Sequence, residues 1–132
     1  MTRKRILVMS MLAATGLAVP LASPGIAGAA EPADLLLAVH QQENGTNNVT
    51  ELRCGPAGGD HPRASVACDE ITAAGGDFTK LPGDLGSTYC TFEYSPVTVS
   101  AIGTWRGQTV EYVETFPNSC VLRSETGSVF TF

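Results

Sequence analysis

The residues from Cys90 to Pro96, in the order Cys-Thr-Phe-Glu-Tyr-Ser-Pro, place a large apolar side chain between a cysteine and a proline. A proline fixes its own φ angle and biases the preceding residue toward an extended shape, and a cysteine can anchor the other end through a disulfide. A segment held in this way can be presented to a partner. An aromatic residue in such a setting can also pack inward, so the rest of the chain must decide between the two.

The first 30 residues have the layout of a secretory signal peptide. A basic start precedes an apolar run of 14 residues, Ile6 to Val19, and small residues follow, so that we expect cleavage after Ala29 or Ala30. Because the run is shorter than the ~20 residues that a bilayer requires, a permanent membrane anchor is the weaker interpretation. We therefore predict a signal peptide over 1–30 and one secreted, extracellular domain over 31–132, with no membrane association after cleavage.

The predicted mature chain is short and acidic. Cleavage removes three of the eight basic residues and none of the 13 acidic ones, which leaves five basic residues against 13 acidic ones and a net charge of −8. The remaining length is enough for one domain with a modest core. This charge repels phosphate backbones and anionic membranes, so nucleic acid is not an expected partner.

Four cysteines follow the predicted cleavage site, at Cys54, Cys68, Cys90 and Cys120. In an oxidising compartment two disulfides are expected, and four cysteines allow three pairings. The spacings include no close Cys-x-x-Cys pair, and the two histidines lie in different segments. We therefore expect no metal site and no cofactor.

The first half of the mature chain predicts two strands. The apolar run from Leu35 to Val39 is typical of a buried strand, and a second strand is expected over about Val49 to Cys54. The polar stretch 41–48 between them contains Asn44-Gly45, a pair that tolerates the positive φ angles of a tight turn. We interpret the Asn-x-Thr patterns at Asn44 and Asn48 as turn chemistry rather than as glycosylation sites.

A helix is expected next. Asp60-His61-Pro62 is typical of a helix start, and Gly75-Gly76 is typical of a helix end. The small and apolar residues between them recur at helical spacing, which predicts that this helix packs on the sheet. Phe78 and Leu81 are expected to reach back into the core. The residues on the predicted inner face of the helix are Ala64, Ala67, Ile71 and Ala74.

The second half predicts three more strands. Val97, Val99 and Ala101 alternate with polar residues, which is the pattern of a half-buried strand. A tight turn over 105–108 leads to a returning strand from Thr109 to Phe116. Residues 117–120 are expected to form a loop and 129–132 a last strand. Five strands and one clear helix indicate an α+β domain with an antiparallel sheet.

The sequence carries no recognisable catalytic arrangement. It lacks the serine-hydrolase, zinc-protease, phosphate-loop and dinucleotide-binding motifs. His61 is expected at a helix terminus, Asp69-Glu70 on the solvated side of a helix, and oxidised cysteines provide no thiol nucleophile. The chain is therefore not expected to be an enzyme; a secreted hydrolase is a further alternative and would show turnover without any added protease.

Binding to another protein is the class of function that the opening stretch favours. If Cys90 pairs with Cys120, Phe92 lies between that anchor and Pro96, and an extended, exposed segment would project it outward. An inhibitor that binds a protease as a substrate does needs this preformed shape, because little ordering entropy is then lost on binding. A secreted, non-inhibitory protein-binding module is the alternative.

Several motifs together carry a family resemblance over almost the whole mature chain. They are the cysteine spacing, Asp60-His61-Pro62, Cys90 to Val97, Trp105-Arg106-Gly107, Tyr112 with Phe116, Asn118-Ser119-Cys120 and Ser128 to Phe132. With these motifs the chain resembles the subtilisin inhibitor-like family, the Streptomyces-type subtilisin inhibitors. The resemblance implies a five-stranded antiparallel sheet with two helices packed on it, disulfides Cys54–Cys68 and Cys90–Cys120, a homodimer, and inhibition of secreted serine proteases of the subtilisin class.

The resemblance also implies roles for the residues of the opening stretch. The scissile bond would join Phe92 to Glu93, with Phe92 in the primary specificity pocket and Asn118 bracing the loop from below. Phe92 stands where methionine, lysine or arginine is often found, which points to subtilisin-like and chymotrypsin-like targets and away from trypsin. The turn at Asn44 is shorter than in typical members, so the resemblance supports the dimer contact less strongly than it supports the loop. The other residues of the implied protease-binding loop are Cys90 and Thr91 before the bond and Tyr94, Ser95 and Pro96 after it.

Overall fold

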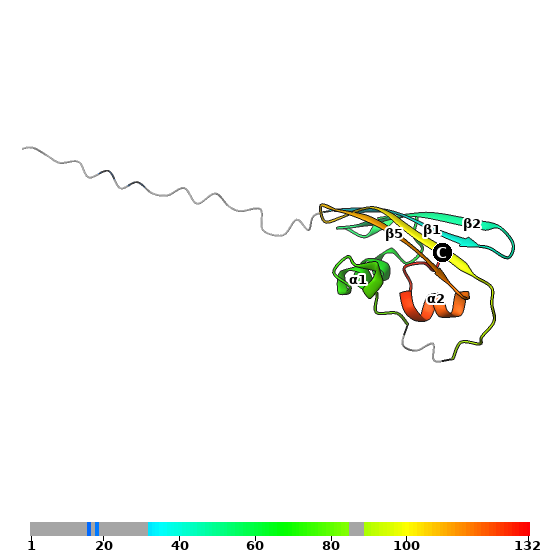
Figure 1. Cartoon of the computed structure of the whole chain (residues 1–132). Helices are drawn as coiled ribbons and strands as arrows, with labels where there is room; N and C mark the ends of the chain where they lie inside the picture. Colours follow the sequence, from blue (N-terminus) through cyan, green and yellow to red (C-terminus); the bar gives the residue numbers. More distant parts are fainter. Residues whose placement is uncertain (1–15, 17, 19–31, 85–88) are drawn as a thin grey trace, which may run out of the picture.

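The computed structural model describes residues 16, 18, 32–84 and 89–132 (Figure 1). The predicted signal peptide, apart from two isolated positions, lies outside the described residues. Within the described part of the chain, no helix is long and apolar enough to cross a membrane.

A five-stranded sheet in the order β3-β2-β1-β4-β5 forms the framework, and every neighbouring pair is antiparallel. The hairpin of β1 and β2 and the hairpin of β4 and β5 pair through β1 and β4, which brings Gln41 opposite Val97. The strands are β1 Ala33–Gln41, β2 Thr46–Cys54, β3 Gly58–Gly59, β4 Val97–Trp105 and β5 Gln108–Phe116. Figure 1 shows both α-helices on the same side of this sheet, so that the other face of the sheet is left open.

Alternation along the strands divides the sheet into a buried and an open face. Leu35, Leu37 and Val39 point toward the helices, as do Val97, Val99 and Ala101 of β4, which confirms the period-two pattern predicted for that strand. The buried strand predicted over Leu35–Val39 forms within β1, but only one of its faces is buried, because Leu36 is 52% exposed. A continuous apolar run does not show which face of an antiparallel sheet remains uncovered.

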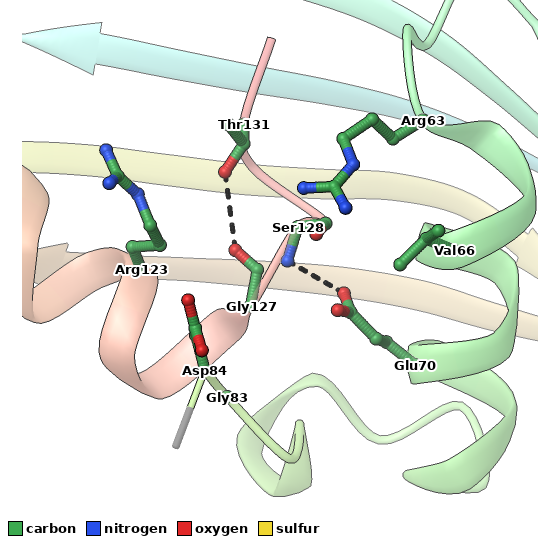
Figure 2. Close-up of a pocket in the computed structure, with 9 residues that line it drawn as sticks. All are labelled: Arg63, Val66, Glu70, Gly83, Asp84, Arg123, Gly127, Ser128 and Thr131. Carbon is green, nitrogen blue, oxygen red and sulfur yellow. Dashed lines mark hydrogen bonds between the residues drawn. The ribbon is translucent and has the colours of Figure 1, made fainter. Parts of the chain in front are cut away.

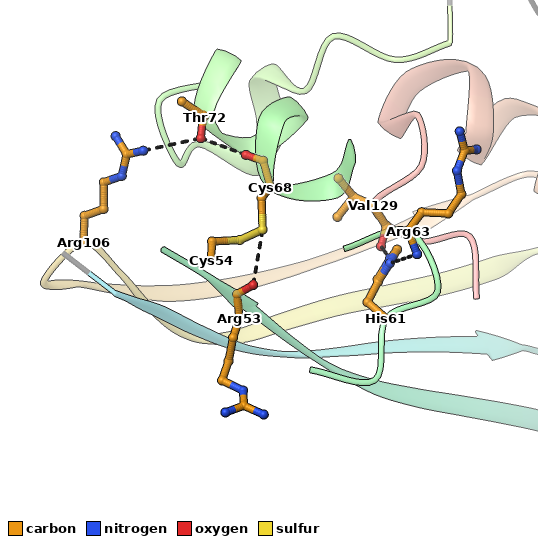
Figure 3. The surroundings of a disulfide bond; sticks show 8 residues. All are labelled: Arg53, Cys54, His61, Arg63, Cys68, Thr72, Arg106 and Val129. Carbon is orange, nitrogen blue, oxygen red and sulfur yellow. Dashed lines mark hydrogen bonds between the residues drawn. A yellow bond between two sulfur atoms is a disulfide. The ribbon is translucent and has the colours of Figure 1, made fainter. Parts of the chain in front are cut away.

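The first helix, α1 Ala64–Ala73, ends as predicted before Gly75 and Gly76, which both have positive φ angles. It begins later than predicted, because its N-cap is Arg63 and Asp60-His61-Pro62 lies before the helix. Its inner face buries Ala67, Cys68 and Ile71. A disulfide from Cys54 at the end of β2 to Cys68 joins this helix to the sheet (Figure 3). A short 3-10 helix, η1 Phe78–Lys80, follows and buries Phe78, and Leu81 is buried after it.

Two predictions for the end of the chain were wrong. The loop predicted over 117–120 is wrong at 119 and 120, which begin a second helix, α2 Ser119–Thr126. Residues 129–132 form no strand, and the fifth strand is instead the two-residue β3. Val129 and Phe130 are nevertheless buried, because the stretch after α2 packs into the core beside the sheet without pairing with it. The fold implied by the resemblance, an antiparallel five-stranded sheet with two helices and two disulfides, is confirmed.

Candidate functional site

An irregular segment over 89–96 leads into β4 and carries three exposed aromatic side chains. The exposed fractions are 95% for Tyr89, 105% for Phe92 and 81% for Tyr94. Exposing three large rings on one short segment is costly in water unless a partner covers them, and such a patch marks an interaction site. The alternative that Phe92 packs inward is wrong, because the side chain lies fully in solvent.

The side chain of Asn118 spans the bond between Phe92 and Glu93 from below. Its Nδ2 donates hydrogen bonds to the Thr91 carbonyl oxygen at 3.2 Å and to the Glu93 carbonyl oxygen at 2.8 Å. Asn118 is itself buried, with 6% exposure, so it forms a fixed support. These two hydrogen bonds hold the backbone on both sides of Phe92 while its ring projects away from the domain.

The same asparagine begins α2. Its backbone is extended, with φ −165° and ψ 170°, and its Oδ1 accepts a hydrogen bond from the Val121 N–H, which is otherwise unpaired in the first turn of the helix. Asn118 was named from the resemblance, but its capping role was missed. The local signal was an asparagine followed by Leu122 and Thr126, two buried residues one helical turn apart.

A disulfide and a backbone hydrogen bond hold the two ends of the segment. Cys90 pairs with Cys120 in the first turn of α2, which is the pairing implied by the resemblance. On the other side, the Ser95 N–H donates to the Pro117 carbonyl oxygen at 2.9 Å. The segment around Phe92 is therefore tied at both ends to one short stretch of chain, 117–120.

The turn between β1 and β2 supports the C-terminal end of the 89–96 segment. The Gln42 N–H donates to the Pro96 carbonyl oxygen at 3.1 Å, and the Ser95 hydroxyl donates to Glu43 Oε2 at 2.6 Å. Gln42 and Glu43 could not be identified from the sequence, because both contacts join residues more than 50 positions apart. Tyr89 was not predicted either, although an aromatic residue directly before Cys90 is a visible signal.

His61 lies away from this segment and is used structurally. Its Nδ1 accepts a hydrogen bond from the Arg63 N–H at the start of α1, at 3.0 Å, so its Nε2 is the donor to the Val129 carbonyl oxygen, also at 3.0 Å (Figure 3). The ring is buried and touches Phe132 edge-on. This arrangement links the helix start to the chain end and leaves no free ring nitrogen for proton transfer.

A polar cleft of about 600 Å³ lies between α1, α2 and the stretch after α2 (Figure 2). The Glu70 carboxylate in it accepts a hydrogen bond from the Ser128 N–H at 2.8 Å, and the Arg63 and Arg123 side chains lie at its edges. No cluster of three or more metal-ligating side chains occurs among the described residues. The exposed apolar surface lies instead on the 89–96 segment, which is therefore the candidate functional site.

The fold and this site define a small protein, stapled by two disulfides, that exposes a braced segment with three aromatic side chains. The subtilisin inhibitor-like family model matches residues 31–118, and the chain belongs to that family. This is a family of protease inhibitors and not of enzymes.

Relatives and a solved structure agree with this assignment. The chain is 37% identical to a subtilase-type protease inhibitor of Streptomyces fradiae, over 98% of this chain and 96% of that protein. It is 48% identical to subtilisin inhibitor-like protein 1 of Streptomyces cacaoi, over 61% of this chain and 76% of that protein. The structure matches Streptomyces caespitosus sermetstatin, solved in complex with Bacillus licheniformis subtilisin, with a TM-score of 0.63 and 33% identity, over 76% of this chain and 99% of that chain.

Proposed function

We propose that this protein inhibits serine proteases of the subtilisin class by presenting the bond from Phe92 to Glu93 as a substrate would. The observation that carries the proposal is the fully exposed Phe92 ring on a backbone that Asn118 holds on both sides. The family membership and the subtilisin complex of sermetstatin support the class of target.

The mechanism uses the protease's chemistry and the inhibitor's geometry. The protease serine adds to the Phe92 carbonyl carbon, the bond to the Glu93 nitrogen breaks, and that nitrogen leaves as an amine after taking up a proton. Water then hydrolyses the acyl-enzyme, or the Glu93 amine attacks it and re-forms the peptide bond as the serine leaves. The inhibitor supplies no catalytic group.

The braced segment favours the return reaction. Asn118 holds the backbone on both sides of the bond. The Cys90–Cys120 disulfide also holds the side before it, and the Ser95 contact with Pro117 the side after it. The amine therefore stays close to the acyl group, and a tethered reactant has a high effective concentration. Net cleavage is slow because re-formation of the bond competes with release of the products. Binding is tight because the segment is already ordered and loses little conformational entropy in the complex.

Phe92 sets the expected targets. A large aromatic side chain suits the hydrophobic primary pocket of chymotrypsin-like and many subtilisin-like proteases, whereas trypsin places a carboxylate in that pocket. Tyr89, also exposed, provides a second apolar contact three residues earlier. Energetically, a few buried aromatic anchors dominate such interfaces.

The substitution Phe92→Lys tests the reactive bond. Inhibition of chymotrypsin should weaken by at least 100-fold and inhibition of trypsin should appear, because the lysine ammonium would meet the pocket carboxylate. Inhibition constants for chymotrypsin and trypsin measure this. Tyr94→Lys, which adds the same charge two residues later, is the control and should not create trypsin inhibition. Unchanged inhibition of both proteases by Phe92→Lys would place the reactive bond elsewhere.

A titration separates inhibition from the alternative of a non-inhibitory binding module. Purified mature protein should abolish subtilisin activity as its concentration rises from nanomolar to micromolar. A binding module would leave the activity intact over that range.

We also propose secretion, with residues 1–30 removed as a signal peptide. The support is the charged start, the apolar run and the small residues before position 31, together with two disulfides that require an oxidising compartment. The mass of the protein recovered from culture medium should correspond to a chain beginning at Glu31 or Ala30. A secreted chain that retains Met1 would contradict the proposal.

A homodimer through the open face of the sheet is the assembly that the surface favours. Leu36, Val49, Ile102 and Val113 point away from the helices and are between 51% and 69% exposed. Leu36 and Ile102 are direct cross-strand partners, so the apolar surface is continuous at the centre of the sheet. In a two-fold homodimer the same face of a second copy would cover these apolar side chains.

A further inference from the structure

The sheet register places the turn between β1 and β2 beside the C-terminal end of the reactive segment, by which we mean residues 89–96 with the proposed bond from Phe92 to Glu93. Gln41, the last residue of β1, pairs with Val97, the first residue of β4, and the next residue back along the chain is Pro96. The hydrogen bond from the Gln42 N–H to the Pro96 carbonyl oxygen continues this pairing one step beyond the sheet. Glu43 thus lies two residues beyond the hydrogen-bonded pairing of β1 with β4. This register is fixed, because a shift by one residue would move the buried side chains of the strand to the exposed face.

The turn is ordered by its own hydrogen bonds. The Gly45 N–H donates to the Gln41 carbonyl oxygen at 3.0 Å, and Gly45 has the positive φ angle of 69° that this closure requires. The Asn44 side chain accepts from the Thr46 N–H at 2.9 Å and donates to Gln41 Oε1 at 3.2 Å. Glu43 is therefore presented from a compact, internally bonded turn.

Ser95 is held from two directions. Its N–H donates to the Pro117 carbonyl oxygen at 2.9 Å, and its hydroxyl donates to Glu43 Oε2 at 2.6 Å. The second bond is short and has an ionised acceptor, which makes it stronger than a bond between neutral groups. Ser95 lies two residues after Glu93, on the part of the chain that becomes free when the proposed bond breaks.

We propose that Glu43 is a positioning residue for the inhibitory reaction: through Ser95 it holds the leaving segment in place, so that the Glu93 amine returns to the acyl-enzyme. This inference rests on the proposed reactive bond. Without the contact, the segment after Glu93 gains more conformational freedom in the cleaved chain than in the intact one, because the peptide bond still restrains it in the intact chain. The equilibrium between cleaved and intact inhibitor therefore shifts toward the cleaved form.

The test measures the equilibrium ratio of cleaved to intact inhibitor in the presence of catalytic amounts of subtilisin, approached from both sides and read by mass spectrometry. Glu43→Leu and Ser95→Ala should each raise the ratio roughly 3- to 10-fold, and the double variant should show no larger change than either single one, because both remove the same bond. Glu43→Gln keeps an acceptor oxygen at the same reach but loses the charge, so its ratio should lie between those of the wild-type protein and Glu43→Leu.

Asp69→Leu, which removes an exposed carboxylate from α1, is the matched control and should leave the ratio unchanged. Ratios within twofold of wild type for both Glu43→Leu and Ser95→Ala, or effects that add in the double variant, would overturn the inference. Those results leave the proposed function standing as long as the wild-type protein is cut between Phe92 and Glu93. A wild-type protein that is not cut there overturns the reactive bond and this inference together.

Discussion

At the scale of single residues, Asn118 combines two roles that different substitutions can separate. Its Oδ1 caps α2, and its Nδ2 supports the carbonyl groups on both sides of the proposed bond. Serine is also a good capping residue, but its side chain is too short to reach both carbonyl groups. The two functions of one buried side chain therefore depend on different atoms.

Asn118→Ser should keep most of the stability and lose most of the bracing, whereas Asn118→Ala should lose both. We expect the alanine variant to be less stable than the serine variant by about 1 kcal/mol, the usual value of a helix cap. Both variants should be cleaved by subtilisin at least tenfold faster than the wild-type protein. Urea unfolding and cleavage time courses measure the two effects, and equal cleavage rates for wild type and Asn118→Ser would contradict the bracing role.

Tyr112 predicts an alkaline loss of stability. Its ring stacks against Phe78 and Phe130, and burial, followed by the hydrogen bond from its hydroxyl to Glu114, raises the pKa of the phenol above its usual value of 10.0. Glu114 is a charged residue on the face of β5 that otherwise carries Val110, Tyr112 and Phe116, and this hydrogen bond gives it a partner there. Because the folded protein then holds the proton more tightly than the unfolded chain, stability is fully present below about pH 10 and falls above it.

Urea unfolding midpoints at pH 8 and pH 11 test this expectation. The wild-type midpoint should fall between the two values, and Tyr112→Phe should reduce that fall. The midpoint of Tyr94→Phe, a substitution at an exposed position of the 89–96 segment, should fall as much as that of the wild type. The same fall in all three proteins would show that other groups cause the alkaline sensitivity.

At the scale of elements, the two disulfides stabilise different parts of the fold. The Cys54–Cys68 bond joins β2 to α1 and closes 14 residues, and the Cys90–Cys120 bond joins the 89–96 segment to α2 and closes 30 residues. On the chain-entropy model each contributes about 3 to 4 kcal/mol to the free energy of unfolding. Their energies are therefore similar although their positions differ.

Replacing each pair by alanines should give similar losses of stability and different losses of inhibition. Without Cys90–Cys120 the segment before the proposed bond is free to leave, so we expect the inhibitor to become a substrate that subtilisin degrades within minutes. Without Cys54–Cys68 the folded fraction should still inhibit. Unfolding curves and activity assays below the unfolding midpoint measure both. Equal inhibition by the two variants would contradict a special role for the second disulfide.

At the scale of the whole molecule, the open face of the sheet predicts the assembly state. Ile102→Lys places two like charges close together in a two-fold dimer and removes apolar contact, so it should convert the dimer to a monomer. Val66→Lys is the control, because Val66 is an exposed apolar residue on α1, on the other side of the sheet. Sedimentation equilibrium measures the masses. A monomeric wild-type protein at micromolar concentrations would contradict the dimer.

What the sequence determined by itself was local. Alternation in β4, the glycines after α1, the tight turn over 105–108 and the layout of the cysteines all follow from the residues' own geometry and polarity, and the structure agrees with them. The proline and cysteine around Phe92 were also visible in the sequence, as was the family resemblance. The bond from Phe92 to Glu93 remains a prediction.

Only the tertiary structure decided which of these local options is realised. Phe92 and Phe130 are both aromatic residues in short segments. Phe130 is buried because the sheet and helices cover it, whereas Phe92 is not covered and is fully exposed. The stretch after Asn118 became a helix because its cap and core contacts outweigh a weak sequence pattern. The contact between Glu43 and Ser95 depends on the register of β1 with β4, a long-range pairing that neither segment encodes on its own.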